Sequence, residues 1–143
     1  MVSAILSDPT IRMLEQTMDF TEQRHNVLLE DIANASTPGF VQRDLPVAQF
    51  QKSLRDAVKR QRESLNDLYD PQSADTVGFE PGGSDVTTQA VETPNSVPFH
   101  DRGVRSMEYL MSQMADNALA HNMAAQFLKN RYDMIARAIT MKA

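Results

Sequence analysis

The last forty residues, Val104 to Ala143, read VRSMEYLMSQMADNALAHNMAAQFLKNRYDMIARAITMKA and decide the fold. Mostly apolar side chains recur there in unbroken steps of three and four, with no Pro or Gly. This heptad spacing is typical of a helix that buries a narrow stripe against another helix. Such a helix would extend roughly 58 Å, too long to cover its own stripe, so it needs a helical partner. The predicted packing positions are Val104, Met107, Met111, Met114, Ala118, His121, Ala125, Leu128, Tyr132, Ile135 and Ile139.

A second stretch with the same spacing lies near the N-terminus and predicts a helix to about residue 35. Asp8-Pro9 marks its start, because Asp caps a helix and Pro suits the first turn. Its predicted packing positions are Ile11, Leu14, Met18, His25, Leu28 and Ile32. The sequence therefore predicts a mainly α fold in which two long terminal helices pair as an antiparallel coiled coil.

The apolar residues of the two stripes favour one register of this pair. It sets Ile11 beside Ile135 and His25 beside His121, although a register one heptad away matches similarly well. One interpretation of the two histidines is that both are neutral and structurally satisfied. The other is that their protonation in mild acid places two like charges together and loosens the helix pair.

The N-terminal helix is predicted to end at a turn formed by Asn34, Thr37, Pro38, Gly39 and Phe40. Pro38 disfavours the α conformation at the residue before it, and Gly39 permits a positive φ. Pro-Gly in the central positions is typical of a type II turn. The chain is therefore expected to change direction here.

Between the terminal helices, the sequence predicts a shorter helix over residues 47–69 and an extended arm that contains Pro and Gly. Residues 70–99 hold four of the seven prolines, five acidic residues and no Lys or Arg. Such a composition buries too little apolar surface to order a chain, so we expect a flexible arm with a short turn near Gly82-Gly83. The predicted segments are the N-terminal helix (1–35), the turn and middle helix (36–69), the acidic arm (70–103) and the C-terminal helix (104–143).

The composition excludes several classes of site. The chain has no Cys, its three histidines lie at no metal-ligand spacing, and no nucleophile or phosphate-binding motif occurs. We therefore expect no enzyme activity, no cofactor, no metal and no small-molecule substrate. No continuous basic face indicates nucleic-acid binding, and no apolar run approaches a membrane span. The first residues lack the pattern of a cleaved secretory signal.

The segment from Asp31 to Phe40, DIANASTPGF, resembles the NIAN-x-x-TPG-aromatic signature of the flagellar rod and hook family. Arg24, the Arg43-Asp44-Leu45 segment and the Glu108-Tyr109-Leu110-Met111 segment also fit the family. Together the matching parts span about residues 8–55 and 100–143. Asp31 stands where the family usually has Asn. Within the family the chain is most similar to proteins of the proximal rod.

The resemblance implies a structural subunit of the bacterial flagellar basal body, assembled with copies of itself into a helical tube that transmits torque. It further implies export by the flagellar apparatus without a cleaved signal peptide. The implied partners are other rod proteins, the membrane ring and adaptor proteins at the rod base, and the export apparatus. Phe50 and Leu54 resemble the Phe-x-x-x-apolar element that some export substrates present to the export gate, although packing within a helix explains the same spacing.

Three alternatives remain open at this point. Another short rod subunit of the same family would share the turn and the terminal helices. A cytosolic coiled-coil export chaperone or adaptor would use its stripes to bind a partner's amphipathic helix, but it would not need the Thr-Pro-Gly turn. A small enzyme is the third alternative, and no motif supports it.

Overall fold

The computed structural model describes residues 8–63, 70–80, 83–93 and 102–140. Within these residues the fold is mainly helical, as predicted. Its helices are α2 (Pro9–Asn34), α3 (Val47–Glu63) and α4 (Arg102–Thr140), and its strands are β1 (Arg43–Asp44), β2 (Val77–Phe79), β3 (Val86–Thr88) and β4 (Val91–Glu92). The predicted middle helix is shorter in the described part, because residues 64–69 lie outside it.

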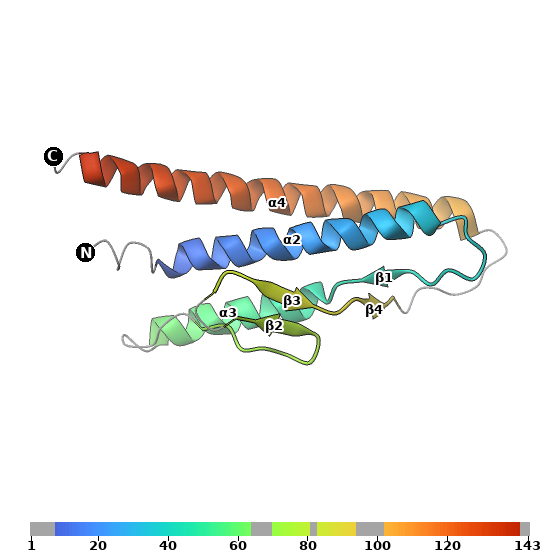
Figure 1. Ribbon diagram of the computed structural model, residues 1–143, viewed down its shortest axis with the longest axis horizontal. Coiled ribbons are helices and arrows are strands. Elements are labelled where there is room, and N and C mark those ends of the chain that lie inside the picture. Colours follow the sequence, from blue (N-terminus) through green and yellow to red (C-terminus); the bar gives the residue numbers. More distant parts are fainter. Residues whose placement is uncertain (1–7, 64–69, 81–82, 94–101, 141–143) are drawn as a thin grey trace.

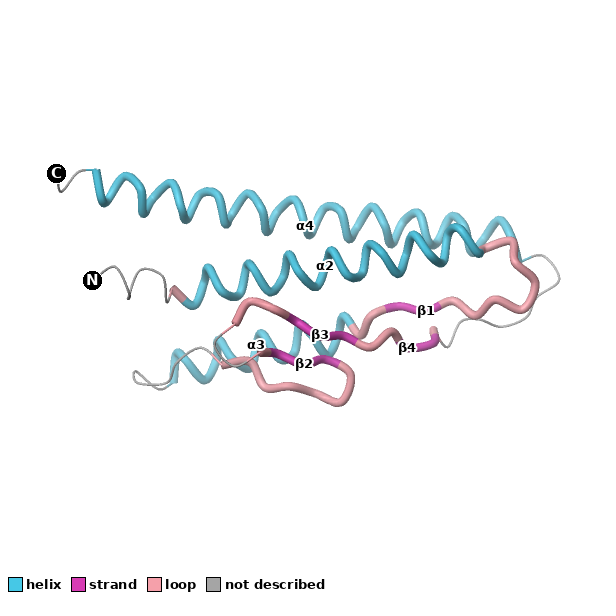
Figure 2. The backbone as a smooth tube through the Cα atoms, viewed as in Figure 1, coloured by secondary structure: helices cyan, strands magenta, loops and turns pink. Residues whose placement is uncertain are grey.

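The two long helices lie side by side and run in opposite directions (Figures 1 and 2). Side-chain hydrogen bonds join Thr10 to Arg131 near one end of the pair and Arg24 to Gln113 farther along. Residue numbers therefore rise along α2 as they fall along α4. Supercoiling of the pair stays a prediction, whereas the antiparallel neighbourhood follows directly from these contacts.

Local sequence signals set both ends of α2. The Asp8 carboxylate accepts a hydrogen bond from the Thr10 backbone N–H at 2.9 Å, which caps the first turn as predicted. After Asn34, the backbone N–H of Phe40 donates to the Thr37 carbonyl at 3.2 Å, and Gly39 has a φ of 79°. These are the hydrogen bond and the positive φ of a type II turn, so the predicted turn is confirmed.

The strands form two small antiparallel sheets on the side of α2 opposite to α4 (Figure 1). In the first sheet β1 pairs with β4, so that Arg43 lies opposite Glu92. In the other, β2 pairs with β3 so that Phe79 lies opposite Val86. The backbone N–H of Gly83 donates to the Glu80 carbonyl at 3.1 Å, consistent with the turn expected near this glycine.

The expectation of a flexible arm is wrong for residues 77–79 and 86–88. Their apolar side chains belong to the hydrophobic core, which comprises Phe20, Leu45, Phe50, Val77, Phe79 and Val86. The Phe50 ring stacks on Phe20 with centroids 4.0 Å apart and on Phe79 with centroids 6.0 Å apart. The composition of the arm is poor in apolar residues on average, but three well-placed ones bury against aromatic rings from two helices.

The molecule therefore has three layers (Figure 2). α4 forms one outer layer, α2 lies in the middle, and the strands with α3 form the other outer layer. The hydrophobic core lies between the middle layer and the strand layer, so it stabilises the α2 side of the molecule.

Candidate functional site

The interface between α2 and α4 is the first candidate site, because the sequence analysis places its predicted residues there. On α2, Ile11, Leu14 and Leu28 are buried, as predicted for packing positions. Met18, His25 and Ile32 are partly buried. These six positions all lie on a covered part of α2.

On α4 the predicted positions fall into two groups, one partly buried and one exposed. The partly buried predicted positions are Met107, Met114, His121, Ala125, Leu128 and Ile135. The exposed ones are Met111, Ala118, Tyr132 and Ile139, and the side chain of Val104 lies outside the described residues. The buried positions in the described part of α4 are Leu110, Asn117 and Ala124, which the sequence analysis did not select. They alternate along the helix with the partly buried positions. Ranking positions by apolar character missed Asn117, because a polar side chain can occupy the buried face when it has a hydrogen-bond partner.

The predicted register is also wrong. His121 Nδ1 is hydrogen-bonded to Thr21 Oγ1 at 2.9 Å. Thr21 lies four residues before His25, the partner of His121 that the apolar pattern favours. The side-chain amide of Asn117, itself 3% exposed, donates to the Thr21 backbone carbonyl at 2.8 Å. Because His121 has a hydroxyl rather than a second imidazole as its partner, the proposed repulsion between paired histidines has no basis here.

A polar junction centred on Arg24 connects α2, β1 and α4. Arg24 donates through Nε to Asp44 Oδ1 at 2.8 Å and through Nη2 to Asp44 Oδ2 at 2.7 Å. Arg24 Nη2 also donates to Gln113 Oε1, and the Gln113 amide donates to the Tyr109 hydroxyl at 2.6 Å. The paired side chains of Arg24 and Asp44 are only 11% and 19% exposed. This bidentate ion pair therefore fixes the relative orientation of the two side chains and also neutralises their charges.

The Arg24 junction joins separate parts of the family signature. Arg24, Asp44 and Tyr109 come from three distant segments that were each noted in the sequence for the resemblance. The structure brings them to one place between α2, β1 and α4. Sequence reasoning recognised the segments, but it gave no signal that they meet.

Asp31 is buried beside this turn and holds the strand that follows it. Its Oδ2 accepts a hydrogen bond from the Arg43 backbone N–H at 2.9 Å, while no partner for Oδ1 is found among the described residues. Burial raises the pKa of Asp31 above its ordinary value, although the nearby Arg43 opposes this. Asn34 assists the helix end, because its amide donates to the Glu30 carbonyl at 2.9 Å.

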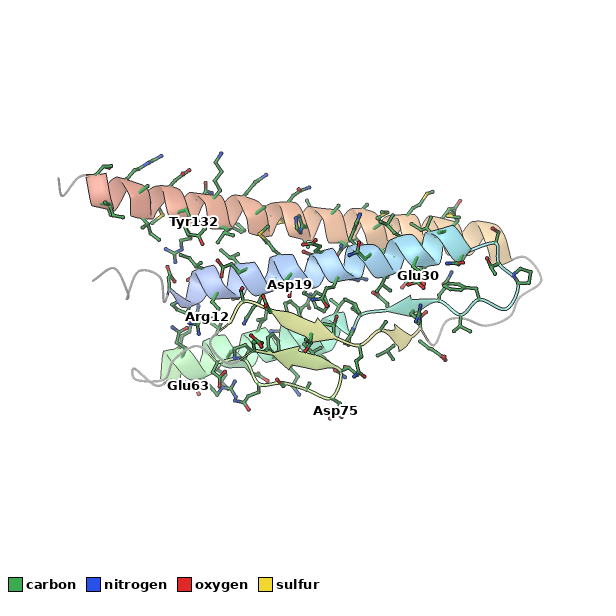
Figure 3. All side chains as sticks on the ribbon, viewed as in Figure 1. Arg12, Asp19, Glu30, Glu63, Asp75 and Tyr132 are labelled. Carbon is green, nitrogen blue, oxygen red and sulfur yellow. The ribbon has the colours of Figure 1, made fainter. Side chains whose placement is uncertain are left out.

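The face of α2 opposite α4 binds the edge of β3 through polar side chains that sequence reasoning missed. Asp19 Oδ2 accepts a hydrogen bond from the Val86 backbone N–H at 2.7 Å, and the Gln23 amide donates to the Val86 carbonyl. The Gln16 amide donates to the Gly83 carbonyl at 3.3 Å. Asp19 lies in the space between α2 and the strands (Figure 3). The only sequence signal is that these residues recur three and four apart on one helical face.

The outward side of α4 carries large apolar residues that no described part of the chain covers. We define the outer apolar face as Leu119, Met123, Phe127 and Met134. Leu119 is 61% exposed, Phe127 54% and Met134 58%. Leu119, Met123 and Phe127 are four residues apart, so they form a continuous stripe along the helix. An exposed stripe of this kind is typical of a surface that binds another protein.

Near the other end of the pair, Tyr132 points from α4 toward α2 (Figure 3). Its hydroxyl donates to the Glu15 carboxylate at 3.0 Å, and this hydrogen bond raises the pKa of Tyr132. Tyr132 thus bridges the helices at their surface, although it is not buried between them.

The other predicted site, Phe50 with Leu54, lies in the hydrophobic core. Phe50 is 3% exposed and Leu54 packs against the same cluster. The structure therefore gives these residues a packing role. Binding to an export gate stays a prediction, and it could concern only a chain that has not yet folded.

The described residues contain no group of three or more His, Asp or Glu side chains that could hold a metal ion. None of the helices in the described ranges is long and apolar enough to cross a membrane. What this arrangement offers chemically is packing surface and hydrogen bonding.

Comparison with known proteins gives matches along most of the chain. No protein-family model matches it. The chain is 24% identical to the flagellar basal body rod protein FlgB of Escherichia coli (strain K12) over 128 residues, which cover 87% of this chain and 88% of that protein. It is 26% identical to FlgB of Salmonella typhimurium (strain LT2) over 122 residues, which cover 85% of this chain and 86% of that protein. These matches confirm the resemblance to flagellar rod proteins.

Proposed function

We propose that this chain is a structural subunit of the bacterial flagellar basal-body rod, of the FlgB type and therefore part of the proximal rod. The observation that carries the proposal is the similarity to FlgB proteins, which covers 87% of the chain in one comparison and 85% in the other. The Thr-Pro-Gly turn and the Arg24 junction support it, because they are formed by the segments on which the resemblance rests.

Self-association into a helical tube is the mode of assembly that we propose. The outer apolar face of α4 supports this, since its side chains are exposed in the single chain and contact with neighbouring subunits would cover them. Met123 and Met134 on this face are flexible, so they suit contacts with neighbours in non-identical surroundings. Head-to-tail contacts that do not close into a ring generate such a helical polymer.

The mechanical role that we propose is torque transmission through paired α2 and α4, acting as an antiparallel coiled coil. The middle layer supports this role, because α2 is held on one side by α4 and on the other by the hydrophobic core. A helix fixed on both sides resists bending better than one that packs on a single neighbour. The turn at Thr37 to Phe40 would set the direction in which the chain leaves this rigid pair.

The proposed surroundings follow from the family resemblance. The subunit would reach the base of the rod through the flagellar export apparatus, without a cleaved signal peptide. It would contact copies of itself, other rod proteins, and the membrane ring and adaptor proteins beneath them. A cytosolic export chaperone is less well supported, since the similarity is to proteins named as rod subunits. Fractionation separates the two, because a rod subunit copurifies with basal bodies and a chaperone stays in the soluble fraction.

Gly39→Val tests the role of the turn in a flagellated cell that depends on this chain. The φ of 79° at Gly39 suits glycine, and a β-branched residue there costs about 1–2 kcal/mol or more. A Cβ at this position would meet nothing within 4 Å, so the expected damage is to the backbone rather than to packing. We expect Gly39→Val to reduce swimming and the yield of rods in purified basal bodies.

The matched control is Gly39→Asn, because Asn tolerates the left-handed conformation better than other residues with a side chain. We expect this variant to retain rods and swimming. Normal rods with Gly39→Val would remove the proposed role of the turn. Normal swimming after deletion of the gene would overturn the proposed function as a whole.

A further inference from the structure

The observed register of α2 and α4 differs by four residues from the register that the apolar residues favour. The favoured register places Met111 and Tyr132 against α2. In the observed register Met111 is 57% exposed and Tyr132 45% exposed. Apolar burial alone therefore does not explain the position of α4, and another interaction must compensate for this exposure.

Interhelical hydrogen bonds provide that interaction. Gln113 accepts a hydrogen bond from Arg24, Asn117 donates to the Thr21 carbonyl, and His121 is hydrogen-bonded to the Thr21 hydroxyl. These three residues of α4 are four apart, so they lie along one side of the helix. Asn117 is buried, and a buried amide that loses its partner destabilises a fold markedly.

A displacement of α4 by four residues would break this set of contacts. The residue facing the Thr21 hydroxyl would become Ala125, which has no polar side chain. The residue facing Thr10 would become Ile135 in place of Arg131, whose Nη2 donates to Thr10 Oγ1 at 3.1 Å. The displaced register thus exchanges hydrogen bonds for apolar burial.

We propose that Gln113, Asn117 and His121 determine the register of the two long helices, against a second register one helical turn away. Polar residues at packing positions select one register of a helix pair, at a cost in apolar stability. Displacement by one turn preserves the packing of helical ridges, so the second register is a discrete state. The chain is held in its observed register by polar contacts in the middle of the interface.

The test measures the distance between two spin labels in the full-length chain. The sequence has no Cys, so Asn26→Cys on α2 and Lys129→Cys on α4 supply two unique labelling sites, and both positions are exposed. In the second register Lys129 lies four residues closer to Asn26 along the helix axis. The label distance then shortens by about 6 Å, from the rise of 1.5 Å per residue.

The test variant combines Gln113→Ala, Asn117→Ala and His121→Ala. Alanine favours helix and adds no large apolar group that would draw α4 to either register. The matched control combines Ser112→Ala, Asn122→Ala and Gln126→Ala, which are exposed polar positions on the same helix. We expect the shorter distance in the test variant and the original distance in the control.

A second variant separates a change of register from a loss of folding. Adding Met111→Gln and Tyr132→Gln to the test variant weakens the apolar attraction to the second register, so the longer distance should return. The original distance in the test variant would overturn the proposal, because apolar packing would then determine the register by itself. A broad distribution without a shorter peak would overturn it too, since a discrete second register would be absent.

Discussion

The two long helices have similar apolar patterns, but they are buried very differently. On α2 the buried residues are Ile11, Leu14, Gln16, Phe20, Thr21, Leu28 and Asp31, and they face both α4 and the strand layer. On α4 the buried side chains among those described are Leu110, Asn117 and Ala124. The comparison teaches that a heptad pattern indicates how much surface a helix can bury, but not which neighbour buries it. For α2 the neighbours lie within the chain, whereas no described part of the chain covers the outer apolar face of α4.

The strongest test of this difference compares a phenylalanine from each helix. Phe20→Ala removes a ring that is 3% exposed and stacked on Phe50, so we expect it to lower the free energy of unfolding by about 3–5 kcal/mol. Phe127→Ala removes an exposed ring and should change the same quantity by less than about 0.5 kcal/mol. Urea unfolding of the isolated chain measures both. Equal losses would show that α4 is buried within the chain after all.

The second test compares two arginines that attach β1 to α2. Arg24→Ala leaves Asp44 in a mostly buried place without its two-pronged partner, so we expect a loss of about 3 kcal/mol. Arg43→Ala breaks an ion pair with Glu30 whose side chains are 41% and 52% exposed, and it should cost at most about 1 kcal/mol. The same urea experiment applies. If the two variants were equally stable, the Arg24 junction would not hold the layers together.

The smallest expected effect concerns Asp31, at the end of α2 where the layers meet. Because its pKa in the fold is raised above 3.8, its contribution to stability is greatest at pH values below 3.8. That contribution is lost as the pH rises through the raised pKa. Asp31→Asn should therefore be more stable than the original chain at neutral pH, and its advantage should shrink as the pH falls toward 3.8.

The measurement for Asp31 is thermal unfolding across this pH range, with Glu30→Gln as the control. Glu30 neighbours Asp31 in sequence, but its ion pair with Arg43 is exposed, so its replacement should give little of this dependence. A pH-independent difference between Asp31→Asn and the original chain would contradict the expectation. It would also show that the charge of Asp31 does not determine the behaviour of this position.

Features set by neighbouring residues could be predicted from the sequence. Asp8 and Pro9 correctly located the start of α2, and Pro38 with Gly39 correctly predicted the turn, because capping and positive φ are local effects. The mainly α class follows likewise from the spacing of apolar residues. For the candidate site, the predicted α2 positions Ile11, Leu14 and Leu28 are buried.

Features set by distant contacts could not be predicted. Asn117 donates to the Thr21 carbonyl on the other helix, and the strands at residues 77–79 and 86–88 pack against Phe20 and Phe50. Hydropathy ranks Asn117 as a surface residue and the arm as a linker, because it averages over sequence and ignores partners. A buried amide or a short apolar strand can be recognised only once its partner is in place.

The hydrogen bonds from α2 to Val86 have one more consequence. A strand whose backbone groups are free at its outer side is a template on which another chain can add a strand and start aggregation. Asp19 and Gln23 occupy both backbone groups of Val86. Although α4 exposes an apolar face, the chain is thereby protected from pairing with a strand of another chain at this residue.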